Sequence, residues 1–388
     1  MSPATHHPPF WRYFGLGAAV VLVAAVATFL MEDSWFFRHM ENSNLDTWLN
    51  AKASSPSGKV FVVSISEQDY KSLFGGTSPL NPKAVLPIIT AIEQSGAKLL
   101  GVDLDTSGWS ATDVAGVPKD IPIVWARDYS EENSKMEDVL GRDDPGICFG
   151  LPAYTPDEDG VIRHYQPLVT LPNGETEFSF ATRLLAGCEA KPIKTEGEGE
   201  EGKLINYLGG SNAFGHLSAG ALLALSKVPG WSESKSPLRD KIVLLGGAFR
   251  AARDKFYTPA RRMDGVDIIA HTIESESPGG EVKSPGSLFF FMTDVLLGLS
   301  LVAGGWLLPR KWALPAMILI VTVAAFFGSW LAFRSFGYFA SFVPVLAGVL
   351  THELFEHFVE HHELLKEHKE LVHERDELRQ ELAELKHS

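Results

Sequence analysis

The segments 59-KVFVVSIS-66 and 98-KLLGVDLD-105 decide the fold of the water-soluble part of this 388-residue chain. The first is a continuous apolar run of strand length with β-branched residues, and the second has the pattern of another buried strand. Between them, residues 84–95 carry apolar side chains at helical spacing, and Gly96 follows as a stop. This β-α-β order predicts a parallel pair of strands joined by a right-handed crossover.

Further segments extend the α/β pattern. After the turn 156-PDEDG-160, residues 161–171 alternate as a strand, and Asn173-Gly174 gives a second turn, so a hairpin or meander is expected. The other expected elements are a short connection at 67–74, strands at 122–125, 148–151, 204–207 and 241–245, helices at 178–185 and 266–276, and a mobile linker at 197–202. We therefore predict one α/β domain with a mixed sheet.

Four apolar runs bracket this domain, at residues 14–31, 287–308, 313–333 and 337–352. A transmembrane helix needs roughly 20 apolar residues, and the first and fourth runs lie near the lower limit. The first run is either an uncleaved anchor or a signal peptide, and the three later runs favour the anchor.

The basic residues near the four runs predict the topology. Arg12 precedes the first run, Arg310 and Lys311 follow the second, and Arg334 alone follows the third. The positive-inside rule then places residues 1–13, the Arg310 loop and residues 353–388 in the cytoplasm, and residues 32–286 outside.

Asp294 lies about two turns inside the second apolar run, where a carboxylate is costly unless it faces protein or water. Either it makes a functional polar contact, or it is satisfied by a neighbouring helix, by protonation or by a shallow position. Gly298 and the small residues after it permit close helix approach in the same run.

The composition excludes some classes of function. The net charge is −14 and no basic stripe is present, which argues against nucleic-acid binding. No Ser/His/Asp set with local motif support is present, so we predict no enzymatic activity. The two cysteines, Cys148 and Cys188, either form a disulfide in an oxidising compartment or are buried thiols.

The C-terminal segment predicts a dimer. Leu364, Leu371, Leu378 and Leu385 recur every seven residues, as in a parallel coiled coil, although polar residues at the facing positions weaken it. His357 and His361 lie four residues apart, which suits one helix face holding a metal, but a solvated helix is the favoured interpretation. We predict neither a metal site nor a cofactor.

Charged residues near the predicted strands are candidates for ligand binding. Asp103 and Asp105 end the second strand, and Glu67 and Asp69 follow the first, so they can meet at the carboxyl edge of the sheet and bind a metal or cationic ligand. The alternative is helix capping and loop solvation. Arg163 is a further candidate, unless it pairs with Asp157 or Asp159 across the turn.

Several segments together resemble the CHASE type-2 family. They are VFVVSISEQDY (60–70), GAKLLGVDLDT (96–106), PDEDGVIRHYQPL (156–168), LINYLGG (204–210), DKIVLLGGA (240–248), DKFYTP (254–259) and DGVDIIAHTIES (264–275). The resemblance covers roughly residues 40–350. It implies an extracellular sensory domain of bacterial receptors, with one span before the domain, about three after it, and a cytoplasmic cyclase or kinase.

The chain departs from the family pattern in three ways. Ser66-Glu67-Gln68-Asp69 stands where paired acids are typical, and Leu208 follows Tyr207 where an arginine is common. We also expect the usual effector domain to be absent after the tail. We therefore expect a multi-pass sensor or adaptor of the bacterial inner (plasma) membrane, which binds an unidentified cue and signals through a dimeric tail to a separate cytoplasmic or membrane effector. The alternative is a structural subunit of a membrane complex.

Overall fold

The chain folds into two compact units, residues 45–283 and residues 1–44 with 284–388, and each is described by itself. The computed structural model describes residues 10–31, 34–51, 55–106, 109, 111–114, 116–117, 120–130, 135–137, 147–152, 154–171, 174–192, 202–209, 213–231, 236–307, 310–341, 343, 361, 364–366, 368–373, 375 and 379.

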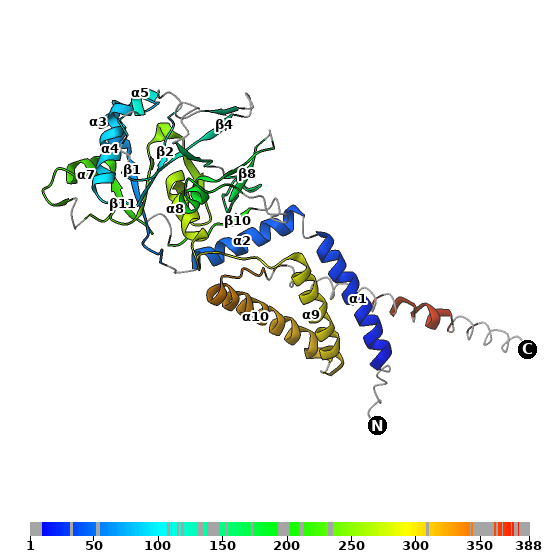
Figure 1. Ribbon diagram of the computed structural model, residues 1–388. Coiled ribbons are helices and arrows are strands. Elements are labelled where there is room, and N and C mark those ends of the chain that lie inside the picture. The colour runs from blue at the N-terminus through cyan, green and yellow to red at the C-terminus, as the bar shows by residue number, and fades with distance from the viewer. Residues whose placement is uncertain are drawn as a thin grey trace, which may run out of the picture. The chain divides into compact units, whose positions relative to one another are not determined.

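A six-stranded parallel sheet forms the centre of residues 45–283 (Figure 1). Its strands, in spatial order, are β11 (Gly215–Ser218), β1 (Val60–Ile65), β12 (Ile242–Gly247), β2 (Leu99–Asp103), β3 (Ile123–Ala126) and β6 (Cys148–Gly150). The predicted β-α-β unit is present, but β12 lies between β1 and β2.

The expectation of a mixed sheet is wrong. All five pairings in the six-stranded sheet are parallel. The antiparallel pairs form separate two-stranded sheets: β8 (Leu168–Thr170) with β9 (Thr176–Phe178), β7 (His164–Tyr165) with β10 (Lys203–Leu204), β13 (Lys255–Tyr257) with β14 (Arg262–Asp264), and β4 (Asp128–Ser130) with β5 (Lys135–Glu137). The alternating pattern at 161–171 predicted the β8–β9 hairpin, but alternation does not reveal which sheet a strand joins.

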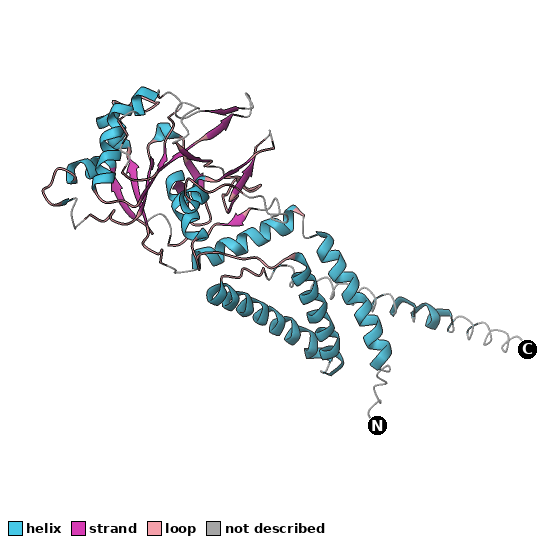
Figure 2. Cartoon of the chain, viewed as in Figure 1, coloured by secondary structure: helices cyan, strands magenta, loops and turns pink. Residues whose placement is uncertain are grey.

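Helices cover both faces of the parallel sheet (Figure 2). On one face lie α3 (Glu67–Phe74), α4 (Pro82–Gln94) and α7 (Ala219–Leu225), and on the other lie α6 (Phe180–Ala186) and α8 (Gly265–Glu276). The alternation along β1 explains the two cores. Val63 packs with α4 and α7, whereas Val62 packs with α6 and α8.

Several local features differ from the sequence expectations. Residues 67–74 form helix α3 rather than a short connection, because Ser66 and Asp69 make a reciprocal capping box at its start. Strand β11 and helix α7 were not predicted. The short strand reads 215-GHLS-218 and carries no run of β-branched or apolar residues.

In the second unit, helices α1 (Phe10–Met31) and α9 (Ser287–Leu307) pack antiparallel. A Cβ atom added at Gly17 would lie 2.6 Å from Val302, and one added at Gly298 would lie 2.5 Å from Val21. The predicted close approach at Gly298 is therefore present, because a larger residue would collide with the facing helix. Helix α10 (Arg310–Phe336) packs beside α9.

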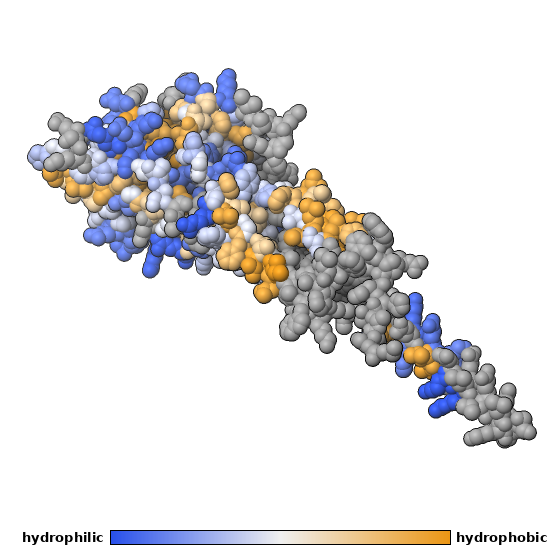
Figure 3. All heavy atoms as spheres, turned by 90° about the horizontal axis from the view of Figure 1, so that it is seen from below, coloured by the Kyte–Doolittle hydropathy of each residue, from blue (hydrophilic) through white to orange (hydrophobic). Residues whose placement is uncertain are grey.

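The apolar runs at 14–31, 287–308 and 313–333 fall largely within α1, α9 and α10. These helices expose large hydrophobic side chains, and hydrophobic residues cover parts of the molecular surface (Figure 3). Within the described ranges, no single helix has both the length and the apolar composition needed to cross a membrane. A bent pair, residues 17–31 with 35–50, meets those criteria together. The second member belongs to helix α2 (Trp35–Ala51).

The last predicted run and the tail are described only in part. Residues 337–341 are not helical, and residues 344–352 lie outside the described residues. In the tail, Leu364 and Leu371 are helical and 62% and 63% exposed. Leu378 and Leu385 lie outside the described residues, so the coiled coil stays a prediction.

Candidate functional site

Arg163 is a buried charged side chain with several acidic partners in residues 45–283. Its guanidinium is 2% exposed and contacts three carboxylates. Nε and Nη2 donate to the two oxygens of Asp46 at 2.8 and 2.9 Å. Nη1 donates to Asp157 at 2.8 Å, and both Nη atoms donate to Asp159, at 2.9 and 2.7 Å. We call these four residues the Arg163 clamp.

The turn before Arg163 explains why Asp157 and Asp159 contact it. The backbone N–H of Gly160 donates to the carbonyl of Asp157, and the N–H of Asp157 donates to the carbonyl of Val161. This tight turn brings Asp157 and Asp159 back toward Arg163, which is the alternative that the sequence left open beside a ligand-binding role. Asp46 comes from helix α2, 117 residues earlier in the chain than Arg163. No local sequence pattern predicted this contact.

Ionisation of the clamp residues is mutually reinforced. Burial disfavours the charged form of Arg163, but hydrogen bonds to Asp46, Asp159 and Asp157 outweigh it and raise the pKa of Arg163 further above its usual range. Burial also opposes ionisation of Asp157, yet hydrogen bonds from His164 and Arg163 hold its pKa below the usual value. The pKa of Asp159 is lowered mainly by its hydrogen bond from Arg163.

The candidate acids at the carboxyl edge of the sheet have separate partners. Glu67 accepts a hydrogen bond from the backbone of Arg250 at 3.0 Å and pairs with Lys71 at 3.2 Å. Asp69 caps α3 and accepts from Gly220 at 3.1 Å. These are the capping and solvation roles weighed as the alternative.

Strand order explains why the four acids do not converge. The acids follow β1 and β2, and β12 lies between those strands. Neighbouring strands are about 4.8 Å apart, so an intervening strand separates the two strand ends by about 10 Å. Asp105 lies beyond β2 and is exposed. Whether any of these acids binds a ligand stays a prediction.

Asp103 has a partly buried acidic neighbour, Asp254, that the sequence did not reveal. Burial, together with repulsion from Asp254, raises the pKa of Asp103. Burial and repulsion from Asp264 likewise raise the pKa of Asp254, which lies between β12 and β13. Among the described residues, no three His, Cys, Asp or Glu side chains are placed to hold a metal ion.

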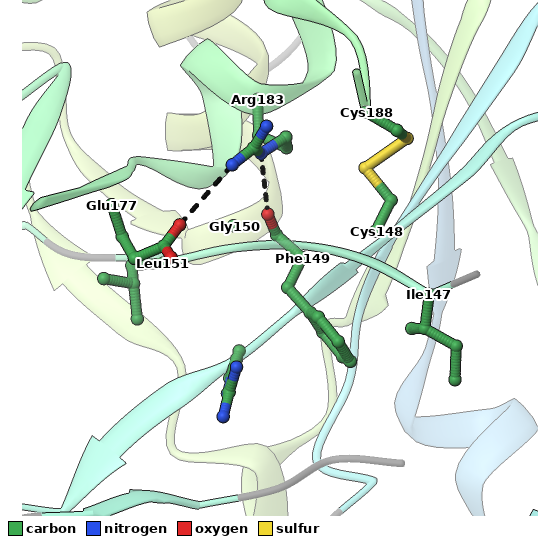
Figure 4. A pocket seen from close by; sticks show the side chains of 9 residues that line it. Ile147, Cys148, Phe149, Gly150, Leu151, Glu177, Arg183 and Cys188 are labelled. Carbon is green, nitrogen blue, oxygen red and sulfur yellow. Dashed lines mark hydrogen bonds and ion pairs between the residues drawn. A yellow bond between two sulfur atoms is a disulfide. The ribbon is translucent and has the colours of Figure 1, made fainter. Parts of the chain in front are cut away.

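A cavity of about 200 Å³ lies beside β6, the last strand of the parallel sheet (Figure 4). Residues 147–151 form one wall, and the disulfide between Cys148 and Cys188 forms another part of the lining. The charged lining residues are Arg127, Glu177 and Arg183. The cysteines thus take the first of the two states allowed by the sequence, and neither arginine was among the predicted site residues.

Arg183 is held in place by backbone carbonyls. It belongs to α6, which Ser179 caps, and its Nε donates to the carbonyl of Phe149 at 3.0 Å. Nη1 donates to the carbonyl of Ala190 at 2.8 Å, and Nη2 approaches Glu177 at 3.4 Å (Figure 4). Burial lowers the pKa of Arg183, but a guanidinium stays charged at neutral pH.

Two further predictions concern residues in the second apolar run and in the C-terminal segment. Asp294 lies in α9, and its side chain is outside what the structure describes. His357 is outside the described residues, and His361 is helical and exposed.

Comparison with known proteins gives one positive result. No curated protein and no solved structure matches the chain. A model of the CHASE2 domain matches residues 19–308, which is most of the chain and includes the whole parallel sheet, the Arg163 clamp and the cavity. The chain therefore belongs to the CHASE2 family of extracellular sensory domains.

Proposed function

We propose that this protein is a bacterial membrane sensor-adaptor. Its α/β domain binds an extracytoplasmic cue, and the change passes through the flanking helices and a dimeric C-terminal helix to a separate effector. In this proposal the protein spans the inner membrane several times with both termini in the cytoplasm. Membership of a sensory family supports the sensor role, and the Arg163 clamp supports the transmission of the signal.

The clamp supports transmission because it joins a helix to the sensor core by buried charge. Asp46 lies on α2, the helix that follows α1 in the chain. Its bidentate pairing with a buried guanidinium is costly to break, since the guanidinium would lose two short charge-assisted hydrogen bonds. A movement of the 157–163 turn is therefore expected to move the end of α2 as well.

The C-terminal side of the domain is bonded in a comparable way. Glu274, near the end of α8, accepts hydrogen bonds from the backbone N–H and the hydroxyl of Ser57 at 2.9 and 2.7 Å. Ser57 follows α2, and α8 precedes α9 in the chain. The segments that enter and leave the domain are thus joined directly, which favours a concerted response of both.

Cysteine crosslinking of the intact protein in membranes tests this proposal. Leu371→Cys is expected to crosslink between two copies, and adding Asp46→Ala is expected to change the crosslink yield. Asp120→Ala is the matched control, because Asp120 is an exposed acid outside the clamp. Absence of any crosslink would contradict the dimeric tail, and a yield insensitive to Asp46→Ala would contradict transmission through the clamp.

Purification of the intact protein in detergent tests the output. A co-purifying cyclase, kinase or regulator is the expected result. A stable multi-subunit assembly that does not respond to small molecules would instead favour the structural-subunit alternative.

A further inference from the structure

We infer that the cavity beside β6 binds a small organic monocarboxylate. The inference deepens the proposed function, because such a ligand would be the cue, and to that extent it rests on that function. The binding itself is a separate property. The acids predicted at the carboxyl edge of the sheet would suit a cation. The cavity beside β6 is a different site, and its arginines suit an anion.

The size of the cavity limits the ligand to about one ring. A cavity of about 150 Å³ in another protein is large enough for benzene. The present cavity, at about 200 Å³, has room for a ring and a carboxylate group. Ligands of drug size occupy pockets of roughly 300–1,000 Å³, so they are too large.

The charge of the described lining favours an anion. Arg127 and Arg183 contribute two guanidinium groups, and Glu177 contributes one carboxylate. Guanidinium is the side-chain group best suited to a carboxylate, because its planar donors form short charge-assisted hydrogen bonds.

Arg183 is oriented for this role by bonds that leave one nitrogen weakly engaged. Nε and Nη1 are fixed by the carbonyls of Phe149 and Ala190. Among the described residues, the hydrogen-bond partner of Nη2 is Glu177, at 3.4 Å, and the Glu177 side chain is 40% exposed. The Arg183 side chain is itself only 9% exposed, but the contact is long and its carboxylate is partly exposed, so a ligand carboxylate can take the place of Glu177.

The same wall offers apolar contact for the body of the ligand. Ile147, Phe149 and Leu151, in β6 and just beside it, line the cavity. Figure 4 shows the side chains of Ile147 and Phe149 on the side of the strand away from Arg183, so a ligand that contacts both lies across the edge of β6. The disulfide attaches the segment after α6 to β6, and the bond from Arg183 to Ala190 holds the same segment. The cavity wall is therefore fixed before a ligand arrives, which lowers the entropic cost of binding.

Calorimetric titration of the full chain in detergent, with benzoate, acetate and benzamide as probes, tests the inference. Benzamide has the shape of benzoate without its charge. We expect benzoate to bind at least about tenfold more tightly than benzamide, because the charge-assisted hydrogen bond is lost with the amide. Equal affinity for the two, or no binding of either benzoate or acetate, would overturn the inference.

Substitutions then locate the site. Glu177→Gln is expected to tighten benzoate binding, because it removes the competing carboxylate, and Arg183→Lys is expected to weaken it. Arg262→Lys is the matched control, since Arg262 is an exposed arginine outside the cavity, and it should leave binding unchanged. Because Arg183→Lys also removes bonds to the backbone, Glu177→Gln decides the matter if that variant fails to fold. An unchanged affinity in Glu177→Gln would contradict the site.

The two proposals fail separately. If benzoate does not bind but Asp46→Ala still alters crosslinking at position 371, the ligand class is wrong and the transmission stands. If benzoate binds but Asp46→Ala does not change the crosslink yield, the inferred ligand site is supported and the proposed transmission through the clamp is wrong.

Discussion

At the scale of single residues, Arg163 is the side chain whose loss should cost the most stability. Arg163→Met leaves three carboxylates without their common partner, and breaking a buried ion pair in this way costs about 3–5 kcal/mol. Arg163→Lys keeps the charge but loses the bidentate contact to Asp46. Its free energy of unfolding should therefore lie between those of Arg163→Met and the wild type. Chemical denaturation of the intact protein in detergent measures both, and equal stability of all three would exclude a structural role for the clamp.

The cost of Arg163→Met should depend on pH. The folded-state pKa values of Asp157 and Asp159 are lowered, so their stabilising contribution is complete above the ordinary carboxyl pKa near 4 and is lost as pH falls below it. The difference in unfolding free energy between wild type and variant should therefore be largest at neutral pH and shrink on acidification through pH 4. A difference that is constant from pH 7 to pH 3 would contradict this account.

Asp103 should show the opposite dependence. Its pKa is raised in the folded state, so the folded protein binds more protons and this group lowers stability as pH rises above about 4. Asp103→Asn should be more stable than wild type at pH 8, by at least about 1 kcal/mol, the free energy of one pKa unit. The advantage should vanish near pH 4. Asp105→Asn, at an exposed position, is the control and should show no such advantage.

At the scale of elements, the disulfide links β6 to the end of α6. Cys148 and Cys188 are 40 residues apart in the chain, and closing a loop of that length stabilises the folded state by about 4 kcal/mol in the chain-entropy description. The double variant Cys148→Ser, Cys188→Ser should lose stability of that order. Wild-type protein treated with a reducing agent should show the same loss, and the double variant should not respond to the reductant.

The central strands could be predicted from the sequence, whereas most of the clamp and the cavity could not. The central strands β1, β2 and β12 were predicted because each is an apolar run that is buried on both faces. Strand β11 was missed because it is short and carries few apolar residues. The sequence offered the pairing of Arg163 with Asp157 or Asp159 as one of two alternatives, because these residues share a turn. Asp46 and the cavity could not be predicted, since both join segments that are distant in the chain.

At the scale of the whole molecule, the proposed topology predicts which residues face the outside of the cell. Lys83→Cys lies at an exposed position on α4, and the native cysteines are paired and do not react. A thiol reagent that cannot cross the inner membrane should label this variant in cells whose outer membrane has been permeabilised. Lys311→Cys should be labelled only after the inner membrane is also permeabilised. Reversed labelling would contradict the orientation derived from the basic residues.

The position of β12 has a consequence for how the domain is made. Val62 of β1 pairs with Leu244 of β12, and β12 in turn pairs with β2, so the centre of the sheet is completed by its last strand in chain order. A domain exported from its N-terminus must therefore wait, with the facing edges of β1 and β2 unpaired, until nearly all of it has emerged. Such non-local pairing folds slowly and exposes strand edges to aggregation. We therefore expect export and folding of this domain to depend on protection of those early strands.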